Sequence, residues 1–150
     1  MTTLGEALAF ARQRIDRLDA RLLLQYATGC THADLLARPE TPVIGPAFAQ
    51  FADWVARRAA GEPLAYLVGE SEFRGRVFQV SPAVLIPRPE TEVLLDLALE
   101  RLAARQSPEV VDLGTGSGIV AISLALECPE ARLSAVDLSP GALAVARNNA

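Results

Sequence analysis

Apolar residues recur at helical spacing through the first part of the chain, residues 1–60. Leu4, Leu8 and Ala11 fall on one face of a helix. Thr3 and Glu6 stand at the start of that helix with the spacing of a capping box. Further apolar runs predict helices from residue 22 to Gly29, over residues 31–36 and from Pro46 to Gly61. Short helices with short connections predict a compact N-terminal helical bundle.

After Pro63 the pattern changes from helical spacing to short strand-like runs. Residues 70–73 and 76–80 flank Gly75, which predicts a β-hairpin. Pro82, Pro87 and Pro89 then make a stiff segment that we do not expect to be helical.

The last third of the chain alternates helical and strand patterns. Helices are predicted over residues 91–104, 118–126 and from Ser139 onwards, and strands over residues 109–113 and 131–136. Two strands joined by a helix form the β-α-β unit of a parallel sheet. The expected fold class is therefore α/β: a helical bundle, a β-hairpin linker and the start of a Rossmann-like, doubly wound sheet.

Between the first strand and its helix lies a glycine-rich turn that follows Asp112. It consists of Gly114, Thr115, Gly116, Ser117 and Gly118. Glycines let the backbone adopt positive φ and approach a ligand closely. Asp137 closes the next apolar run, where an acid commonly binds the hydroxyls of a ribose. These residues predict a site for an adenosine-containing ligand; the alternative is a tight turn without a ligand.

The spacing of the glycines bears on the identity of that ligand. A dinucleotide fingerprint would need a third glycine where Ile119 stands, and Asp112 would repel a pyrophosphate. S-adenosylmethionine carries a sulfonium and an ammonium instead, for which Asp112 is a favourable partner. We therefore expect S-adenosylmethionine as the cofactor, bound by Asp112, residues 114–118 and Asp137. A nicotinamide-dependent dehydrogenase is disfavoured.

Composition narrows the class of protein further. The 150 residues carry a formal net charge of −4, which argues against direct nucleic-acid binding. The longest apolar stretch, residues 119–126, is too short to span a bilayer, and the N-terminus does not resemble a signal peptide. Cys30 and Cys128 lack metal-ligand spacing, as is typical of a reduced, cytoplasmic protein without a metal.

The chain resembles a known family in several segments. These are residues 62–73, Leu85-Ile86-Pro87-Arg88-Pro89-Glu90-Thr91-Glu92, residues 112–118 and residues 135–140. Together they are similar to the HemK/PrmC-type release factor glutamine methyltransferases, and the proline-rich segment is the most specific of them. The resemblance covers most of the chain. It implies a helical substrate-docking domain (residues 1–69), a hairpin and proline-rich linker (70–89) and the first part of a class I methyltransferase domain (90–150).

The resemblance also implies an activity. Family members transfer a methyl group from S-adenosylmethionine to the side-chain amide nitrogen of the glutamine in the Gly-Gly-Gln motif of class 1 peptide-chain release factors. By the same analogy, residues 114–118 line the cofactor, Asp137 binds its ribose and Asp112 assists at the methionine end. The expected partner is thus a release factor, and the oligomeric state stays open.

One motif of the family, Asn-Pro-Pro-Tyr, does not occur in these residues. It orients the substrate amide, whose nitrogen is a poor nucleophile, and orientation can lower a barrier substantially. We therefore expect the chain alone to bind cofactor weakly at best and to transfer no methyl group, and we assign no catalytic residue within it. Because two strands leave a sheet edge open, we also expect it to be the N-terminal part of a longer protein.

Two other functions remain as alternatives. An adenine-N6 nucleic-acid methyltransferase uses a similar fold, although the acidic balance disfavours it. A non-catalytic docking module would consist of the helical bundle and the hairpin. Arg88 and Glu90 are open as well, since an ion pair that fixes the linker and a contact with cofactor or substrate are equally compatible with the pattern.

Overall fold

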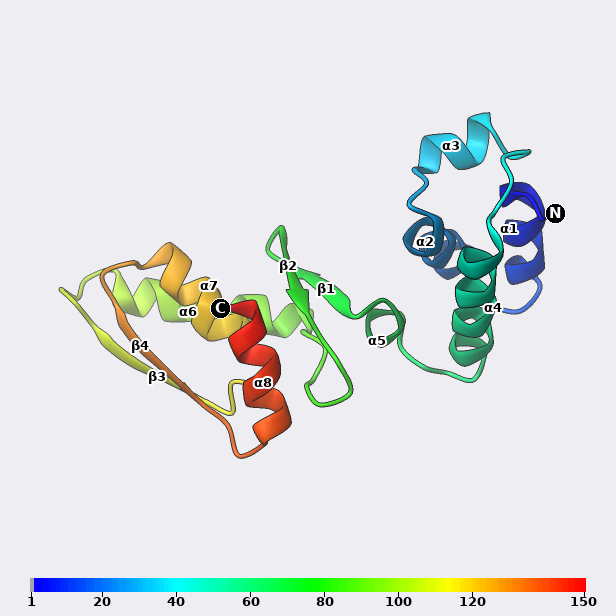
Figure 1. The fold of residues 1–150 in the computed structure, drawn as a ribbon. Helices are drawn as coiled ribbons and strands as arrows, with labels where there is room; N and C mark the ends of the chain where they lie inside the picture. The colour runs from blue at the N-terminus through cyan, green and yellow to red at the C-terminus, as the bar shows by residue number, and fades with distance from the viewer. Residues whose placement is uncertain (1) are drawn as a thin grey trace. The chain divides into compact units, whose positions relative to one another are not determined.

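The computed structural model describes residues 2–150 and divides the chain into two units, Met1–Val68 and Gly69–Ala150. Figure 1 shows the helical first unit in blue to green and the mixed second unit in green to red. Each unit buries its own cluster of apolar side chains. Each therefore has the core that an independent folding unit requires.

Local capping sets the ends of the helices in the first unit. Thr3 and Thr31 each complete a capping box; in the first, Glu6 N donates to Thr3 Oγ1 over 3.3 Å and Thr3 N donates to Glu6 Oε2 over 2.9 Å. Gly29 ends its helix in the left-handed conformation, with φ 71°. The helices are α1 (Leu4–Arg12), α2 (Arg17–Thr28), α3 (His32–Ala37), α4 (Gly45–Ala59) and α5 (Leu64–Val68). The predicted helical bundle is confirmed.

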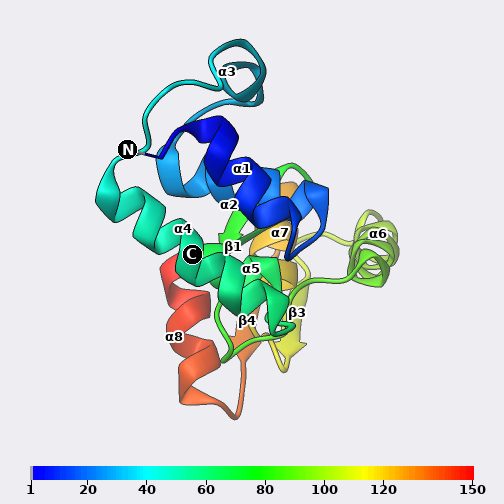
Figure 2. The same cartoon turned by 90° about the vertical axis from the view of Figure 1, so that its right-hand side faces the viewer.

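The core of this unit lies where α1, α2 and α4 pack together, an arrangement that Figure 2 shows from the side. Phe51 and Val55 of α4 and Leu23 of α2 are fully buried there. Ala7 and Ala11 of α1 are also fully buried, and their small side chains let the helices approach closely. Trp54, the single tryptophan of the chain, packs against this core while partly exposed.

The second unit contains a hairpin and a β-α-β unit. Its elements are β1 (Glu70–Phe73), β2 (Arg76–Gln79), α6 (Pro89–Leu102), β3 (Glu109–Leu113), α7 (Ile119–Glu127), β4 (Arg132–Val136) and α8 (Pro140–Asn149). Strands β3 and β4 are parallel, with Val110 opposite Leu133 and Leu113 opposite Val136, and α7 connects them. The predicted parallel unit is thus confirmed.

One face of the β3–β4 sheet packs on helices and the other stays open. Val110 and Leu133 contact the core formed with α6 and α7, which lie along the sheet in Figure 1. Val111, Leu113 and Val136 point to the opposite side and are 58%, 78% and 45% exposed. The carboxyl ends of both strands, where parallel sheets place their sites, remain accessible.

The hairpin belongs to the second unit. Phe73 and Phe78 are 2% and 3% exposed and pack into the same core as Leu95 of α6. Arg76 Nη1 also donates to Glu127 Oε1 of α7 over 3.0 Å. A docking module made of the helical bundle and the hairpin therefore does not match the division of this chain.

One predicted boundary in the proline-rich segment is wrong. Pro89 is not in a non-helical stretch but is the first residue of α6, with Arg88 as its N-cap. Proline suits this position because its fixed φ is helical and the first N–H groups of a helix need no partner within it. Neither Arg88 nor Glu90 forms an ion pair within residues 2–150, so the pair that would have fixed the linker is not found.

Candidate cofactor site

The glycine loop, residues 114–118, joins the carboxyl ends of the two parallel strands. The backbone N–H groups of Gly114 and Thr115 donate to the carbonyl of Val136 over 2.8 and 3.0 Å. Gly114 has φ 76°, a conformation that glycine adopts without strain. The loop therefore turns across the end of β4 directly after β3 finishes.

Asp137, the residue after β4, closes this turn from the other side. Its Oδ2 accepts a hydrogen bond from Gly116 N over 2.9 Å, and its Oδ1 accepts one from Ser139 N over 2.9 Å. These bonds from Ser139 and Gly116 hold the pKa of Asp137 below its usual value, because they stabilise the charged form. Each carboxylate oxygen has a second lone pair, so Asp137 can still accept hydrogen bonds from a ligand.

Asp112 lies near the end of β3, just before the loop, and is partly buried. Its Oδ2 accepts a hydrogen bond from Thr115 Oγ1 over 2.7 Å. This contact orients the carboxylate and uses the threonine hydroxyl within the protein. Two carboxylates thus lie at this end of the sheet, an arrangement that favours a cationic ligand over a phosphate.

A pocket of about 490 Å³ opens beside the loop. It is lined by Leu113, Gly114, Val136, Asp137 and Leu138. Its volume lies within the range of about 300–1,000 Å³ that is usual for small-molecule sites. The apolar side chains can contact the flat face of a base, while Asp137 supplies the polar group that would fix a ribose.

The structure separates the predicted site residues into three groups. Gly114 and Asp137 line this pocket, and Asp112 and Gly116 support it through the bonds described above. Thr115, Ser117 and Gly118 are buried.

Gly118 serves the packing of two helices. It has φ 79°, and a Cβ added there would lie 3.1 Å from both the Ala146 Cβ and the Ile122 Cδ1. The last glycine of the loop therefore allows α8 to pack closely against the start of α7.

Some lining residues were not among those predicted from the sequence. Leu113, Val136 and Leu138 complete the pocket, and Leu138 is fully exposed to it and to solvent. The sequence does hold a signal for Leu138, since it is an apolar residue directly after Asp137 and therefore lies at the same strand end. Leu113 and Val136 line the pocket because they are the last residues of β3 and β4.

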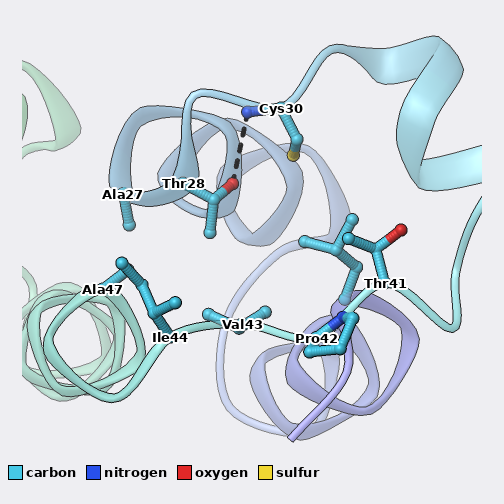
Figure 3. A pocket seen from close by; sticks show the side chains of 9 residues that line it. Ala27, Thr28, Cys30, Thr41, Pro42, Val43, Ile44 and Ala47 are labelled. Atoms are coloured by element: carbon cyan, nitrogen blue, oxygen red, sulfur yellow. Dashed lines mark hydrogen bonds between the residues drawn. The ribbon is translucent and has the colours of Figure 1, made fainter.

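A second pocket, of about 260 Å³, lies in the helical unit (Figure 3). It is bounded by the end of α2 and by the segment before α4, and Cys30 N donates there to Thr28 Oγ1 over 3.3 Å. Among residues 2–150, no carboxylate, histidine or cation lines it. It lacks the polar groups that the pocket beside the glycine loop provides.

Within residues 2–150, no group of histidine, cysteine and acidic side chains is placed to hold a metal ion. Over the same residues, no helix has the length and apolar character needed to cross a bilayer.

Comparison with known families agrees with this architecture. Residues 91–150 match the methyltransferase small domain family, and residues 3–69 match the PrmC N-terminal domain family. The two matches define a methyltransferase-type fold that carries a family-specific helical domain. In both segments the chain is similar to the PrmC-type release factor glutamine methyltransferases.

Curated relatives carry that name. A release factor glutamine methyltransferase of Bordetella pertussis is 49% identical over 150 residues, covering 100% of this chain and 55% of the relative. One of Burkholderia pseudomallei is 50% identical over 136 residues (91% of this chain, 48% of the relative), and one of Salmonella typhimurium is 46% identical over 134 residues (89% and 48%). The chain spans about half the length of the relatives that it matches.

Proposed function

We propose that this protein is an S-adenosylmethionine-dependent methyltransferase that methylates the side-chain amide nitrogen of the glutamine in the Gly-Gly-Gln motif of class 1 peptide-chain release factors. The observation that carries the proposal is the pocket at the ends of β3 and β4. Two carboxylates, Asp137 and Asp112, lie beside its glycine loop and disfavour a phosphate there. The names of the relatives support the choice of substrate.

In this proposal each site residue has a defined task. Asp137 accepts hydrogen bonds from the two ribose hydroxyls while it holds Gly116 N. Leu113 and Leu138 contact the adenine, and Asp112 attracts the positively charged methionine end. The cofactor, when bound, supplies a methyl group from its sulfonium. Once the methyl group is transferred, the sulfur is left as a neutral thioether.

The helical unit and the compartment are part of the same proposal. We assign to the unit Met1–Val68 the docking of the release factor, because the PrmC N-terminal domain family matches this region and no other. We place the protein in the cytoplasm, where its substrate would be found. The free thiols of Cys30 and Cys128 are consistent with a reducing compartment.

The substrate-orienting motif Asn-Pro-Pro-Tyr is absent from the 150 residues. Without it, nothing in these residues would hold the amide nitrogen in line with the methyl–sulfur bond. We propose that the 150 residues by themselves transfer no methyl group. Measurable methylation of a release factor by these residues alone would contradict this part of the proposal.

Two assays test the cofactor and the substrate separately. Isothermal titration should show binding of S-adenosylhomocysteine to the protein and none of NADH. The full-length protein should transfer a labelled methyl group from S-adenosylmethionine to a class 1 release factor. It should not label the same factor with its Gly-Gly-Gln glutamine changed to glutamate, and it should not label DNA. Preference for NADH, or methylation of DNA instead, would overturn the proposal.

A further inference from the structure

A single side chain connects the glycine loop to the hairpin. Asn149, in the last turn of α8, donates from Nδ2 to the carbonyl of Ser117 over 2.9 Å and to the carbonyl of Gln79 over 3.0 Å. Its Oδ1 accepts from Gln79 N over 2.7 Å. Both N–H donors of the amide are thus used, and its oxygen is used as well. The end of α8 lies beside β2 (Figure 1).

At the hairpin, Asn149 completes an exposed strand edge. Within the hairpin, Gln79 lies opposite Glu70, and the next residue, Val80, donates inward to the carbonyl of Gly69 over 2.9 Å. The N–H and C=O of Gln79 therefore point outward, away from β1. The side-chain amide of Asn149 bonds both of these groups, as a neighbouring strand would.

At the glycine loop, Asn149 holds a segment that has unusual freedom. Ser117 is 3% exposed and stands between Gly116, with φ 56°, and Gly118, with φ 79°. Glycines on both sides leave the orientation of the Ser117 carbonyl weakly determined by the backbone. Without Asn149 that buried carbonyl would have no partner, so the loop would have to shift or admit water.

We propose that Asn149 is a positioning residue, which ties the glycine loop to the outer edge of β2 and thereby couples cofactor binding to the order of the hairpin. The inference rests on the proposed function, because it takes the glycine loop to be a cofactor site. Asp137 holds the loop at Gly116 N and Asn149 holds it at the carbonyl of Ser117. The loop is thus fixed by one residue that faces the pocket and by one that does not.

Titration with S-adenosylhomocysteine tests this with a matched control. Asn149→Ala should weaken binding by about tenfold, the usual effect of leaving a buried polar group unpaired. Asn149→Asp should weaken binding at least as much, since its carboxylate would face two carbonyl oxygens although its size is unchanged. Asn148→Ala is the control, because Asn148 is exposed and lies one position earlier in the same helix.

The outcomes separate the inference from the function on which it rests. Equal affinity in the Asn149→Ala and Asn148→Ala proteins would overturn the role of Asn149 and leave the proposed function standing. Failure of the unchanged full-length protein to bind S-adenosylhomocysteine would overturn both.

Amide exchange of the unchanged protein supplies a second test that does not depend on a variant folding. Binding of S-adenosylhomocysteine should slow the exchange of the Gln79 amide together with that of Gly116, because Asn149 connects their segments. Slower exchange at Gly116 with no change at Gln79 would contradict the coupling. A side chain needed only for packing would not transmit this effect.

Discussion

The two units of this chain differ in the sequence distance that their polar contacts span. In the helical unit, Thr3 pairs with Glu6 and Arg57 with Glu62, so that most such contacts link residues within the same or the next turn. In the second unit, the contact between Asn149 and Gln79 spans 70 residues. The first unit is therefore specified largely by local signals, whereas the candidate site depends on segments that only the complete fold brings together.

The units also differ in how their apolar surface is covered. The helical unit encloses Leu23, Phe51 and Val55 completely. The second unit leaves one sheet face open, with Leu113 and Leu138 exposed at the pocket. Stability of the helical unit and ligand binding by the second unit thus depend on different side chains. Variants in the helical core should leave ligand affinity unchanged, and variants at the pocket should leave the stability of the helical unit unchanged.

The largest expected effect comes from the core of the helical unit. Phe51→Ala should destabilise it by about 3–5 kcal/mol, through lost burial and the cavity that remains. Urea unfolding of the 150 residues, followed by the fluorescence of Trp54, measures this unit alone, because Trp54 is their single tryptophan. Leu36→Ala, at a side chain that is 71% exposed, is the control and should have little effect. Loss of S-adenosylhomocysteine binding by folded Phe51→Ala protein would show that the two units are not separable.

A smaller effect is expected in the second unit at Gly118. Gly118→Ala should cost about 2 kcal/mol more than Gly75→Ala, because both glycines have positive φ but only at Gly118 does a Cβ meet neighbouring atoms. The exchange rates of the β3 and β4 amides measure this difference. Equal destabilisation by the two substitutions would mean that α7 and α8 do not pack as closely as described.

Ligand affinity should respond to Asp137 without a change in the helical unit. Asp137→Ala should weaken S-adenosylhomocysteine binding by more than about tenfold, as expected for the loss of a charged hydrogen-bonding group. Glu100→Ala removes an exposed carboxylate of α6 and should leave the affinity unchanged. The unfolding transition reported by Trp54 should be the same in both proteins. Unchanged binding by Asp137→Ala would remove Asp137 from the site.

The smallest effect is a pH dependence at the same carboxylate. Ser139 N and Gly116 N lower the pKa of Asp137 from the ordinary 3.8, so its contribution to stability is complete above that pH and is lost as the pH falls through the lower, folded-state value. The chemical shift of the Gly116 amide proton should follow this titration, with a midpoint below 3.8. In the Asp137→Asn protein, the chemical shift of the Gly116 amide proton should not change over this pH range. A midpoint at or above the ordinary value would contradict the two hydrogen bonds.

The same contrast explains what could be predicted from the sequence. The capping box at Thr3, the stop at Gly29 and the parallel β-α-β unit were predicted correctly because each depends on residues close together in the chain. The start of α6 was misplaced because proline was treated only as a helix breaker, although it is also a favourable first residue.

The residues that surround the candidate site were harder to predict. The positions of Asp112, Asp137 and residues 114–118 followed from spacing, and their roles in binding remain predictions. Asn149 gave no signal, because an asparagine near the end of a helix is usually a surface residue. Only the fold shows that β2, distant in sequence, passes within hydrogen-bonding reach of it.

The membership of the hairpin in the second unit determines where the gene can be divided. A fragment that ends at residue 75 would expose the side chain of Phe73 and would leave β1 without its partner strand. Such a fragment should aggregate. A cut after Val68 keeps every buried residue of the helical core together. A fragment made to test whether the helical unit docks a release factor should therefore end at Val68.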